Sequence, residues 1–249
     1  MMLAIIGGSG LTQLVNMELT KRLVMRTPYG EPSGALTFGR IRGKEVIFLA
    51  RHGYAHTIPP HDVNYRANIW ALSSQNANHI VSIASVGGIR SDLVPGSLVI
   101  PDQIIDYTHG RQSTFFDTRD KPVTHTDFTE PYCEPLRQQC IRAAEACGRR
   151  LIEGGVYAAT QGPRLESAAE INRMERDGAD MVGMTGMPEA ILAREAELCY
   201  AAIAVVANYA AGRGSSAHGV RLEEVNAVLK AAMEQVRIII ENLVEIHDD

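Results

Sequence analysis

Hydrogen-bond donors that could hold an oxyanion follow short apolar runs at several places in this sequence. They are Ser9, Arg51, His52, Ser85 and Thr185. Hydroxyl groups, and a guanidinium above all, donate hydrogen bonds in geometries that match phosphate oxygens. The amide of Asn208 and the carboxylate of Glu166 instead suit the polar edge of a heterocycle. The two sets together predict a site for phosphate beside a ligand that carries a base.

The glycine run GGSG at residues 7–10 could point several backbone N–H groups at an anion. Its spacing matches neither the dinucleotide-binding pattern GxGxxG nor that of a P-loop, which argues against both kinds of site. A tight turn without a ligand explains the same glycines. In the same way, an exposed charged turn is the alternative for Arg51 and His52.

Neither the histidines nor the cysteines have the spacing of a metal site. His52, His56 and His61 surround the dipeptide Pro59-Pro60, so a helix cannot bring them to one face. The cysteines include no CxxC pair, and the first three are seven residues apart, which suits the buried face of a helix; the four are Cys133, Cys140, Cys147 and Cys199. We therefore expect no metal, no disulfide and a reducing compartment.

Alternating apolar segments predict an α/β protein whose strands position these groups. Strands are predicted at 3–6, 46–50, 80–84, 98–100, 154–159, 181–184 and 200–207. Helices are predicted at 64–74, 135–147 and 222–246, from residue 167 onward, and from Pro188, with Glu189 in the first turn; a further helical turn is expected from Leu11. Carboxyl ends of neighbouring parallel strands meet at one edge of a sheet, where such folds bind ligands. We expect the donors above to lie together there.

No repeat, low-complexity tract or linker divides the sequence, so residues 1–249 are expected to form one domain. The polar segment 108–127 is long enough to serve as a lid or as a subunit contact.

The composition excludes several classes of partner. The 24 basic and 29 acidic residues give a net charge of −5, and no basic run exceeds two residues, which argues against nucleic acid. No apolar run approaches the roughly 18 residues that span a bilayer. The N-terminus lacks the basic flank of a signal peptide. We therefore expect a cytoplasmic protein that binds small molecules and has no membrane partner.

Several long motifs resemble one known family over nearly the whole chain. They are IIGGSGL, RHGYAHTIPPHDVNYRANIWAL, GPRLESAAE and GADMVGMTGMPEAILAREAELCYAAIAVVANY, in that order. The resemblance is to the methylthioadenosine phosphorylase and trimeric purine nucleoside phosphorylase family. It implies a three-layer α/β/α fold with a mixed central sheet, a homotrimer, and phosphorolysis, in which phosphate attacks C1′ of a purine nucleoside. It also implies no cofactor, with inorganic phosphate as a co-substrate.

The resemblance assigns site residues by position. The phosphate site would comprise Ser9, Arg51, His52, Ala84, Ser85 and Thr185. The substrate would contact Met184 at the ribose, with Leu165, Glu166, Asn208, Tyr209, Ala210 and Leu222 around the rest of the molecule. His125 resembles a residue that reaches into the neighbouring subunit's site. Methylthioadenosine phosphorylases carry threonine where Ala84 stands, so a phosphate contact there must come from the backbone.

Three positions predict the base. Adenine-specific members resemble this chain but have aspartate at Asn208 and Ala210 and serine at Glu166. Hypoxanthine and guanine carry an N1–H donor that the Glu166 carboxylate can accept, whereas adenine N1 is itself an acceptor. When the wrong base leaves a buried polar group without a hydrogen-bond partner, binding of that base is strongly disfavoured. Asn208 can donate to the purine as negative charge builds on it, so we expect this residue to be catalytic. The alternatives are that Glu166 is only an acid at a helix N-terminus and that Asn208 is only a turn residue at a strand end.

The residue at position 222 predicts which group the sugar carries at its 5′ position. Enzymes for inosine and guanosine resemble this chain there but carry a histidine that binds the 5′-hydroxyl, and methylthioadenosine phosphorylases carry valine. Leucine could cover a methylthio group, whose burial is worth on the order of 1 kcal/mol. The predicted substrate is therefore 5′-methylthioinosine. Methylthioadenosine and ordinary inosine or guanosine remain alternative substrates. A nucleoside hydrolase and a non-catalytic nucleotide-binding module remain alternative functions. The alternative for Leu222 is that it is only the first apolar residue of the last helix.

Overall fold

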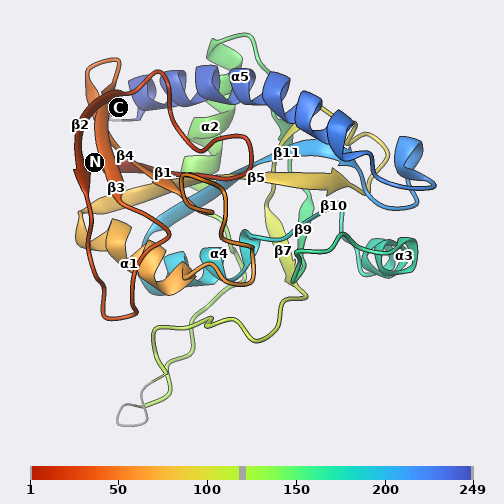
Figure 1. Cartoon of the computed structure of the whole chain (residues 1–249), viewed down its shortest axis with the longest axis horizontal. Helices are drawn as coiled ribbons and strands as arrows, with labels where there is room; N and C mark the ends of the chain where they lie inside the picture. The colour runs from red at the N-terminus through yellow and green to blue at the C-terminus, as the bar shows by residue number, and fades with distance from the viewer. Residues whose placement is uncertain (1, 118–121, 248–249) are drawn as a thin grey trace.

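A mixed sheet with helices on both faces makes up the fold (Figure 1). The computed structural model describes residues 2–117 and 122–247. In chain order the strands are β1 (Met2–Gly7), β2 (Glu18–Leu23), β3 (Leu36–Ile41), β4 (Lys44–Ala50), β5 (Ala77–Gly88), β6 (Leu98–Ile100), β7 (Gln103–Asp106), β8 (Ile152–Glu153), β9 (Val156–Ala159), β10 (Met181–Gly183) and β11 (Cys199–Tyr209). The helices are α1 (Tyr65–Ser74), α2 (Glu134–Ala146), α3 (Ala168–Arg176), α4 (Gly186–Glu195), a short 3-10 helix η1 (Gly214–Ser216) and α5 (Leu222–Ile246).

Two buried apolar clusters separate the layers. Side chains alternate across a strand, so β1 sends Leu3 and Ile5 to one face and Ala4 and Ile6 to the other. The first face packs against α2 and α5, and the second packs against α1 and α4, as Figure 1 shows. The three-layer α/β/α fold is therefore confirmed.

The sheet branches at β5. Within the described residues the strand order is β2-β3-β4-β1-β5-β10-β9-β7, and β11 leaves this path by pairing with β5 and β6. Strand β5 is 12 residues long, so it can pair in parallel with β1 and β11 and antiparallel with β10 near its end. Parallel and antiparallel pairs together make the sheet mixed, as predicted.

Parallel pairing brings the carboxyl ends of β1, β4, β5 and β11 into one region. Gly7 at the end of β1 is paired with Ala50 at the end of β4, so the glycine loop and Arg51 start side by side. Ser85 in β5 is paired with Val205 in β11, shortly before Asn208. The register therefore gathers segments that lie far apart in the sequence.

Local sequence signals account for several helix boundaries. Helix α5 covers the predicted range 222–246. The Asn64 side chain caps α1 by accepting a hydrogen bond from the backbone of Ala67. Ser167 and Glu170 form a capping box at the start of α3.

Two predicted helix starts are wrong. No helix follows Leu11, because its N–H bonds the Gly8 carbonyl at 3.0 Å in a tight turn and Gly10 has φ of 83°. Helix α4 does not run regularly from Pro188, because Met187 and Pro188 both have non-helical backbone angles. Regular helix therefore begins at Glu189.

The expectation of no disulfide is also wrong. Cys133 and Cys199 form a disulfide with a Cα–Cα distance of 5.2 Å and a sequence separation of 66 residues. The Cys133 N–H donates to the carbonyl of Tyr200, which brings the start of α2 against the start of β11. Cys140 is a buried free thiol in the core, as its helical spacing predicts, and Cys147 is a partly exposed one.

The segment 108–127 has no helix or strand in the residues that the structure describes, and residues 118–121 lie outside that description. Its first half is anchored: the Thr114 hydroxyl and the Phe115 N–H both donate to the Glu195 carboxylate. No helix in the described part of the chain is long and apolar enough to cross a membrane.

Candidate active site

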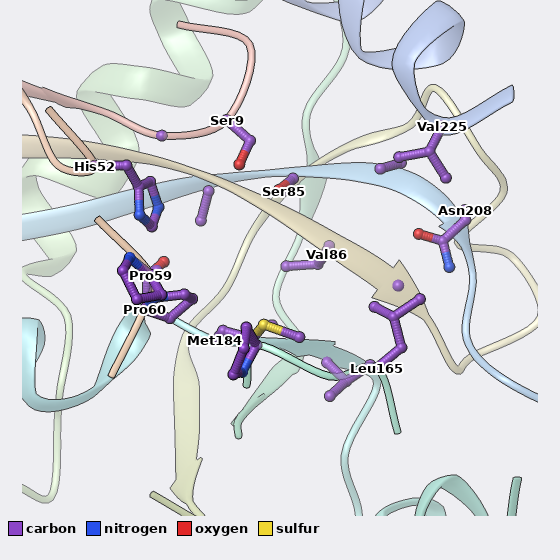
Figure 2. Close-up of a pocket in the computed structure, with 18 of the residues that line it drawn as sticks. Ser9, His52, Pro59, Pro60, Ser85, Val86, Leu165, Met184, Asn208 and Val225 are labelled. Carbon is purple, nitrogen blue, oxygen red and sulfur yellow. The ribbon is translucent and has the colours of Figure 1, made fainter. Parts of the chain in front are cut away.

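A cavity of about 510 Å³ opens where the carboxyl ends of β1, β4, β5 and β11 meet. Twelve of the fourteen predicted site residues line it: Ser9, Arg51, His52, Ala84, Ser85, Leu165, Glu166, Met184, Thr185, Asn208, Ala210 and Leu222. Figure 2 shows Ser9 and His52 toward one end and Asn208 and Leu165 toward the other, with Met184 on the wall between them. The cavity is thus divided into an end rich in anion donors and an end suited to a base.

The turn after β1 requires glycine because other backbone lies directly against it. A Cβ atom at Gly7 would lie 2.0 Å from the carbonyl oxygen of Leu11, and one at Gly8 would lie 2.4 Å from that of Ile83. Gly8 and Ser9 both line the cavity. The turn can therefore present its backbone and the Ser9 hydroxyl to a ligand.

Arg51 is buried at the end of β4 and is held by a bidentate ion pair. Its Nε donates to Glu189 Oε2 at 2.6 Å and its Nη2 to Glu189 Oε1 at 2.8 Å. Nη2 also donates to the Ser82 hydroxyl, and Nη1 donates to the carbonyl of Ile83. These four bonds use four of the five N–H groups of a guanidinium, and one Nη1 hydrogen is left for a ligand.

Charge keeps this pair ionised inside the protein. Burial alone would lower the pKa of Arg51, but the Glu189 carboxylate outweighs it and raises the pKa. Burial alone would raise the pKa of Glu189, but Arg51, Ser82 and Tyr200 together lower it. Glu189 is 0% exposed and accepts a further hydrogen bond from the Tyr200 hydroxyl. The positive charge of Arg51 is thus fixed in place and partly compensated before any anion arrives.

His52 is held as a neutral ring. Burial, and then the charge of Arg51, lower its pKa to about 4. Its Nδ1 lies 2.8 Å from the carbonyl oxygen of Ile58, so the proton of the neutral ring resides on Nδ1. Nε2 is then an acceptor, which suits the hydroxyl of a hydrogen phosphate rather than a bare oxyanion.

Thr185, Ser85 and Ala84 complete the anion end. Thr185 is 7% exposed, and its side chain makes no capping hydrogen bond to α4. Ser85 is half-buried on β5 and lines the cavity beside Ala84. Ala84 has no side-chain donor, as the sequence requires.

Glu166 and Asn208 supply polar groups at the other end. Glu166 Oε1 accepts a 2.6 Å hydrogen bond from the Thr160 hydroxyl, and Glu166 lines the cavity. The Asn208 amide nitrogen donates to the carbonyl of Tyr209, which leaves one N–H and the amide oxygen for a ligand. Ala210 is buried and apolar at this end.

The remaining wall is apolar and open. Leu222, Val220 and Val225 line the cavity where α5 begins. Leu222 is 64% exposed and Leu165 is 43% exposed. Both side chains therefore stand at the mouth of the cavity.

Two predicted residues lie outside the cavity lining. Tyr209 turns its ring toward η1, where a Cβ atom built on Gly214 would lie 2.6 Å from Cδ2 of the tyrosine. His125 is exposed on the segment 108–127 and does not reach the cavity of its own chain.

Sequence patterns missed residues that act through others. Glu189 fits the first turn of a helix, so nothing in the sequence indicated its bond to Arg51. His56 was considered only as a metal ligand, yet it lines the cavity with its Nε2 3.4 Å from Ser9 Oγ. Thr160 and Arg111 do not line the cavity, but they donate hydrogen bonds to Glu166 and Met184, which do. No motif indicated either residue. Among the described residues no cluster of three or more metal-binding side chains is found.

Known proteins resemble this chain along most of its length. Residues 2–245 match the phosphorylase superfamily. The probable S-methyl-5'-thioinosine phosphorylase of Pseudomonas syringae pv. tomato is 51% identical over 234 residues, which cover 94% of each chain. The 6-oxopurine nucleoside phosphorylase of Pyrococcus furiosus is 48% identical over 215 residues, 84% of this chain and 80% of that protein. The structure of methylthioadenosine phosphorylase from Schistosoma mansoni in complex with adenine has a TM-score of 0.94 at 33% identity, over 99% of this chain and 91% of that one.

The layered fold and the cavity at the strand ends are therefore those of a nucleoside phosphorylase fold. The chain belongs to the phosphorylase superfamily, and the predicted resemblance is confirmed.

Proposed function

We propose that this protein catalyses the phosphorolysis of S-methyl-5′-thioinosine to hypoxanthine and 5-methylthioribose 1-phosphate. The observation that carries the proposal is one cavity lined both by the Glu166 carboxylate and by the apolar side chains of Leu222 and Val225. The carboxylate suits a 6-oxopurine, and the apolar wall suits a 5′-methylthio group. Relatives named S-methyl-5'-thioinosine phosphorylase support the same substrate.

Phosphate binds at the end of the cavity that carries the donors. The free Nη1 hydrogen of Arg51 and the hydroxyls of Ser9, Ser85 and Thr185 donate to its oxygens. His52 Nε2 accepts the hydrogen of the phosphate hydroxyl, because its Nδ1 is already committed to Ile58. Ala84 contributes only backbone. Inorganic phosphate is thus a co-substrate, and the proposal includes no cofactor.

The reaction exchanges one bond at C1′ for another. The bond from C1′ to the purine N9 breaks, and both electrons leave with the purine. A phosphate oxygen forms the new bond to C1′ as the sugar passes through an oxocarbenium-like state beside Met184. The proton of hydrogen phosphate balances the reaction by protonating the departing purine.

Asn208 and Glu166 stabilise the departing base. The free N–H of Asn208 donates to N7 or O6 and strengthens as negative charge builds on the purine, so it favours the transition state over the ground state. Glu166 accepts the N1–H that hypoxanthine carries and adenine lacks. Ala210 offers no carboxylate to the base, and Leu165 covers one of its faces. Tyr209 contributes through its carbonyl, which holds the Asn208 amide.

The proposal includes a homotrimer in which His125 reaches the cavity of the neighbouring subunit. His125 is exposed and lies outside its own cavity, and the same segment exposes Phe116 and Val123 by 42% and 80%. Exposed apolar side chains on one segment are typical of a surface that another chain covers. The proposal also includes a cytoplasmic location, where phosphate and nucleosides are both available.

One assay tests the substrate. Purified enzyme is given methylthioinosine, methylthioadenosine, inosine or guanosine, with and without phosphate, and release of free base is followed. We expect methylthioinosine to have the highest kcat/KM and all turnover to require phosphate. Faster cleavage of methylthioadenosine or inosine would contradict the assignment, and turnover without phosphate would indicate a hydrolase. Tight nucleotide binding with no release of base would indicate a binding module.

Two sets of variants assign the preference to residues. Leu222→His should raise inosine turnover by supplying a donor for the 5′-hydroxyl. Glu166→Ser combined with Asn208→Asp should shift the preference toward adenine. Unchanged inosine turnover in the first variant would remove Leu222 from the specificity.

A phosphorylase for ordinary 6-oxopurine nucleosides is the second candidate function. The observation that favours it is the 64% exposure of Leu222, because a leucine that open covers a methylthio group only in part. The Pyrococcus furiosus relative carries that name. The ratio of methylthioinosine to inosine turnover separates the two candidates.

A further inference from the structure

Glu166 is held at one carboxylate oxygen only. Its Oε1 accepts the Thr160 hydroxyl at 2.6 Å, and no second hydrogen bond to this carboxylate is found in residues 2–117 and 122–247. The same hydroxyl lies 3.2 Å from the carbonyl oxygen of Gly183. A hydroxyl has one proton, and the shorter distance to a charged acceptor assigns it to Glu166. Oε2 is left for a ligand.

Thr160 is itself buried and held by hydrogen bonds to its backbone. It is 7% exposed, and its N–H donates to the Gly183 carbonyl at 2.8 Å, which ties it to the end of β10. Its carbonyl and that of Gln161 accept hydrogen bonds from Arg111 Nη2 at 3.2 and 2.8 Å. The backbone that carries the hydroxyl is therefore held against the end of β10.

Arg111 links this turn to the wall that faces the ribose. Its Nη1 donates to the carbonyls of Met184 and Met187 at 2.8 and 2.5 Å and to the Tyr65 hydroxyl at 3.2 Å. The turn also packs on Met184 directly, since a Cβ atom at Gly162 would lie 2.5 Å from its sulfur. The turn that carries Glu166 and the wall of the cavity are thus one connected unit.

We propose that Thr160 is a positioning residue that sets base specificity: its hydroxyl orients Glu166 so that the free carboxylate oxygen faces the N1–H of a 6-oxopurine. Arg111 supports it by fixing the backbone on which the hydroxyl stands. This inference rests on the proposed function. A carboxylate bound at one oxygen loses rotational freedom before the substrate arrives, so less ordering is needed on binding.

Substituting Thr160 by valine tests the proposal, because valine keeps the shape and removes the hydroxyl. Thr160→Val should lower kcat/KM for methylthioinosine by about 10- to 100-fold, as expected when a buried carboxylate loses a charge-assisted hydrogen bond. It should leave KM for phosphate within about twofold, since no phosphate donor is altered. The ratio of methylthioinosine to methylthioadenosine turnover should fall, and Thr160→Ser should keep that ratio near the wild-type value.

A double variant separates positioning from a general structural role. If Thr160 acts through Glu166, then adding Thr160→Val to Glu166→Gln should change the base ratio by less than about twofold beyond Glu166→Gln alone. Additive losses, or an equal loss for every nucleoside and for phosphate, would overturn the inference. If the valine variant does not fold, Thr160→Ala is measured in the same cycle.

The wild-type enzyme and Glu166→Gln distinguish this failure from failure of the proposed function. A wild-type enzyme with no preference for 6-oxopurines, or a Glu166→Gln variant that keeps the preference, would overturn the proposed function and this inference with it. A preference that depends on Glu166 but survives Thr160→Val would overturn the inference about Thr160 alone.

Discussion

Arg51 and Glu189 place two opposite charges out of contact with water beside the phosphate end of the cavity. Their bidentate contact holds the guanidinium plane. Ser82 accepts a further hydrogen bond from Arg51, and Tyr200 donates one to Glu189. Removing one partner of such a pair leaves a buried charge uncompensated, which costs more than the intact pair contributes. The stability of this region and the geometry of its one free donor therefore depend on the same carboxylate.

Glu189→Gln should destabilise the fold by about 3–5 kcal/mol, because Arg51 stays charged and loses its ionic partner. The KM for phosphate should rise as the guanidinium becomes free to move. Urea unfolding and phosphate-dependent kinetics measure the two effects. Glu197→Gln is the matched control, since this exposed residue lies just beyond α4 and should change stability by less than about 0.5 kcal/mol. Equal stability of the two variants would contradict the prediction.

The neutral state of His52 predicts a pH dependence of stability. Its pKa falls from 6.5 in the unfolded chain to about 4 in the folded protein, so between these values the unfolded chain binds more protons. Stability therefore falls as the pH drops from 6.5 toward 4. His52→Asn should reduce the stability lost between pH 7 and pH 4.5 by about 2–3 kcal/mol, at roughly 1.4 kcal/mol per pKa unit.

Urea unfolding without phosphate at the two pH values measures this effect. The exposed His218→Asn variant serves as the control and should match the wild-type difference. If His52→Asn loses as much stability between pH 7 and pH 4.5 as the wild type, the His52 ring is protonated in the folded state at the lower pH.

At the scale of single residues, the side chains that line the cavity were predictable and those that support them were not. Ser9, His52 and Asn208 follow apolar runs, and they stand in motifs whose resemblance to a family assigned their roles by position. Glu189 and Thr160 bond to residues 138 and 6 positions away, and neither has a distinctive pattern around it. A glutamate in a first helical turn and a threonine after a strand are too common to indicate a partner.

Elements were predictable where a local rule determines them. The 3.6-residue period of α5 and the start of α3 near residue 167 depend on neighbours in the sequence, and both were predicted. The branching of the sheet at β5 depends on pairing between distant strands, so periodicity could not show it. The helical turn predicted from Leu11 is absent because Gly10 adopts a left-handed conformation, which a helix cannot include.

The disulfide between Cys133 and Cys199 joins α2 to β11, and local patterns could not predict it because 66 residues separate the cysteines. A closed loop of that length restricts the unfolded chain, so the double variant Cys133→Ser with Cys199→Ser should lose about 4 kcal/mol of stability. Reduction of the wild-type protein should lower its urea midpoint in the same direction. Cys147→Ser is the control, since this thiol is free. A midpoint insensitive to reduction would contradict a stabilising role.

The whole molecule presents a cavity that its own chain leaves partly open. Leu165 and Leu222 stand exposed at its mouth, and His125 is exposed on the segment 108–127, none of whose described residues lines the cavity of its own chain. In a cyclic trimer every such segment meets the same surface of a neighbour, so the three copies of the segment can complete the three sites. The trimer of the proposed function would thus be required for activity and not only for stability.

Mixing two inactive variants tests this arrangement. Asn208→Ala should abolish the site of its own chain, and His125→Ala should abolish the contribution to a neighbour's site. A site built from an intact Asn208 on one chain and an intact His125 on the next should be active. In randomly mixed trimers at equal amounts about one site in four has this composition. Co-refolding the two variants should therefore restore about a quarter of wild-type activity, in a species whose mass is that of three chains. If the mixture stays as inactive as its components while the trimer forms, His125 does not act across the subunit boundary.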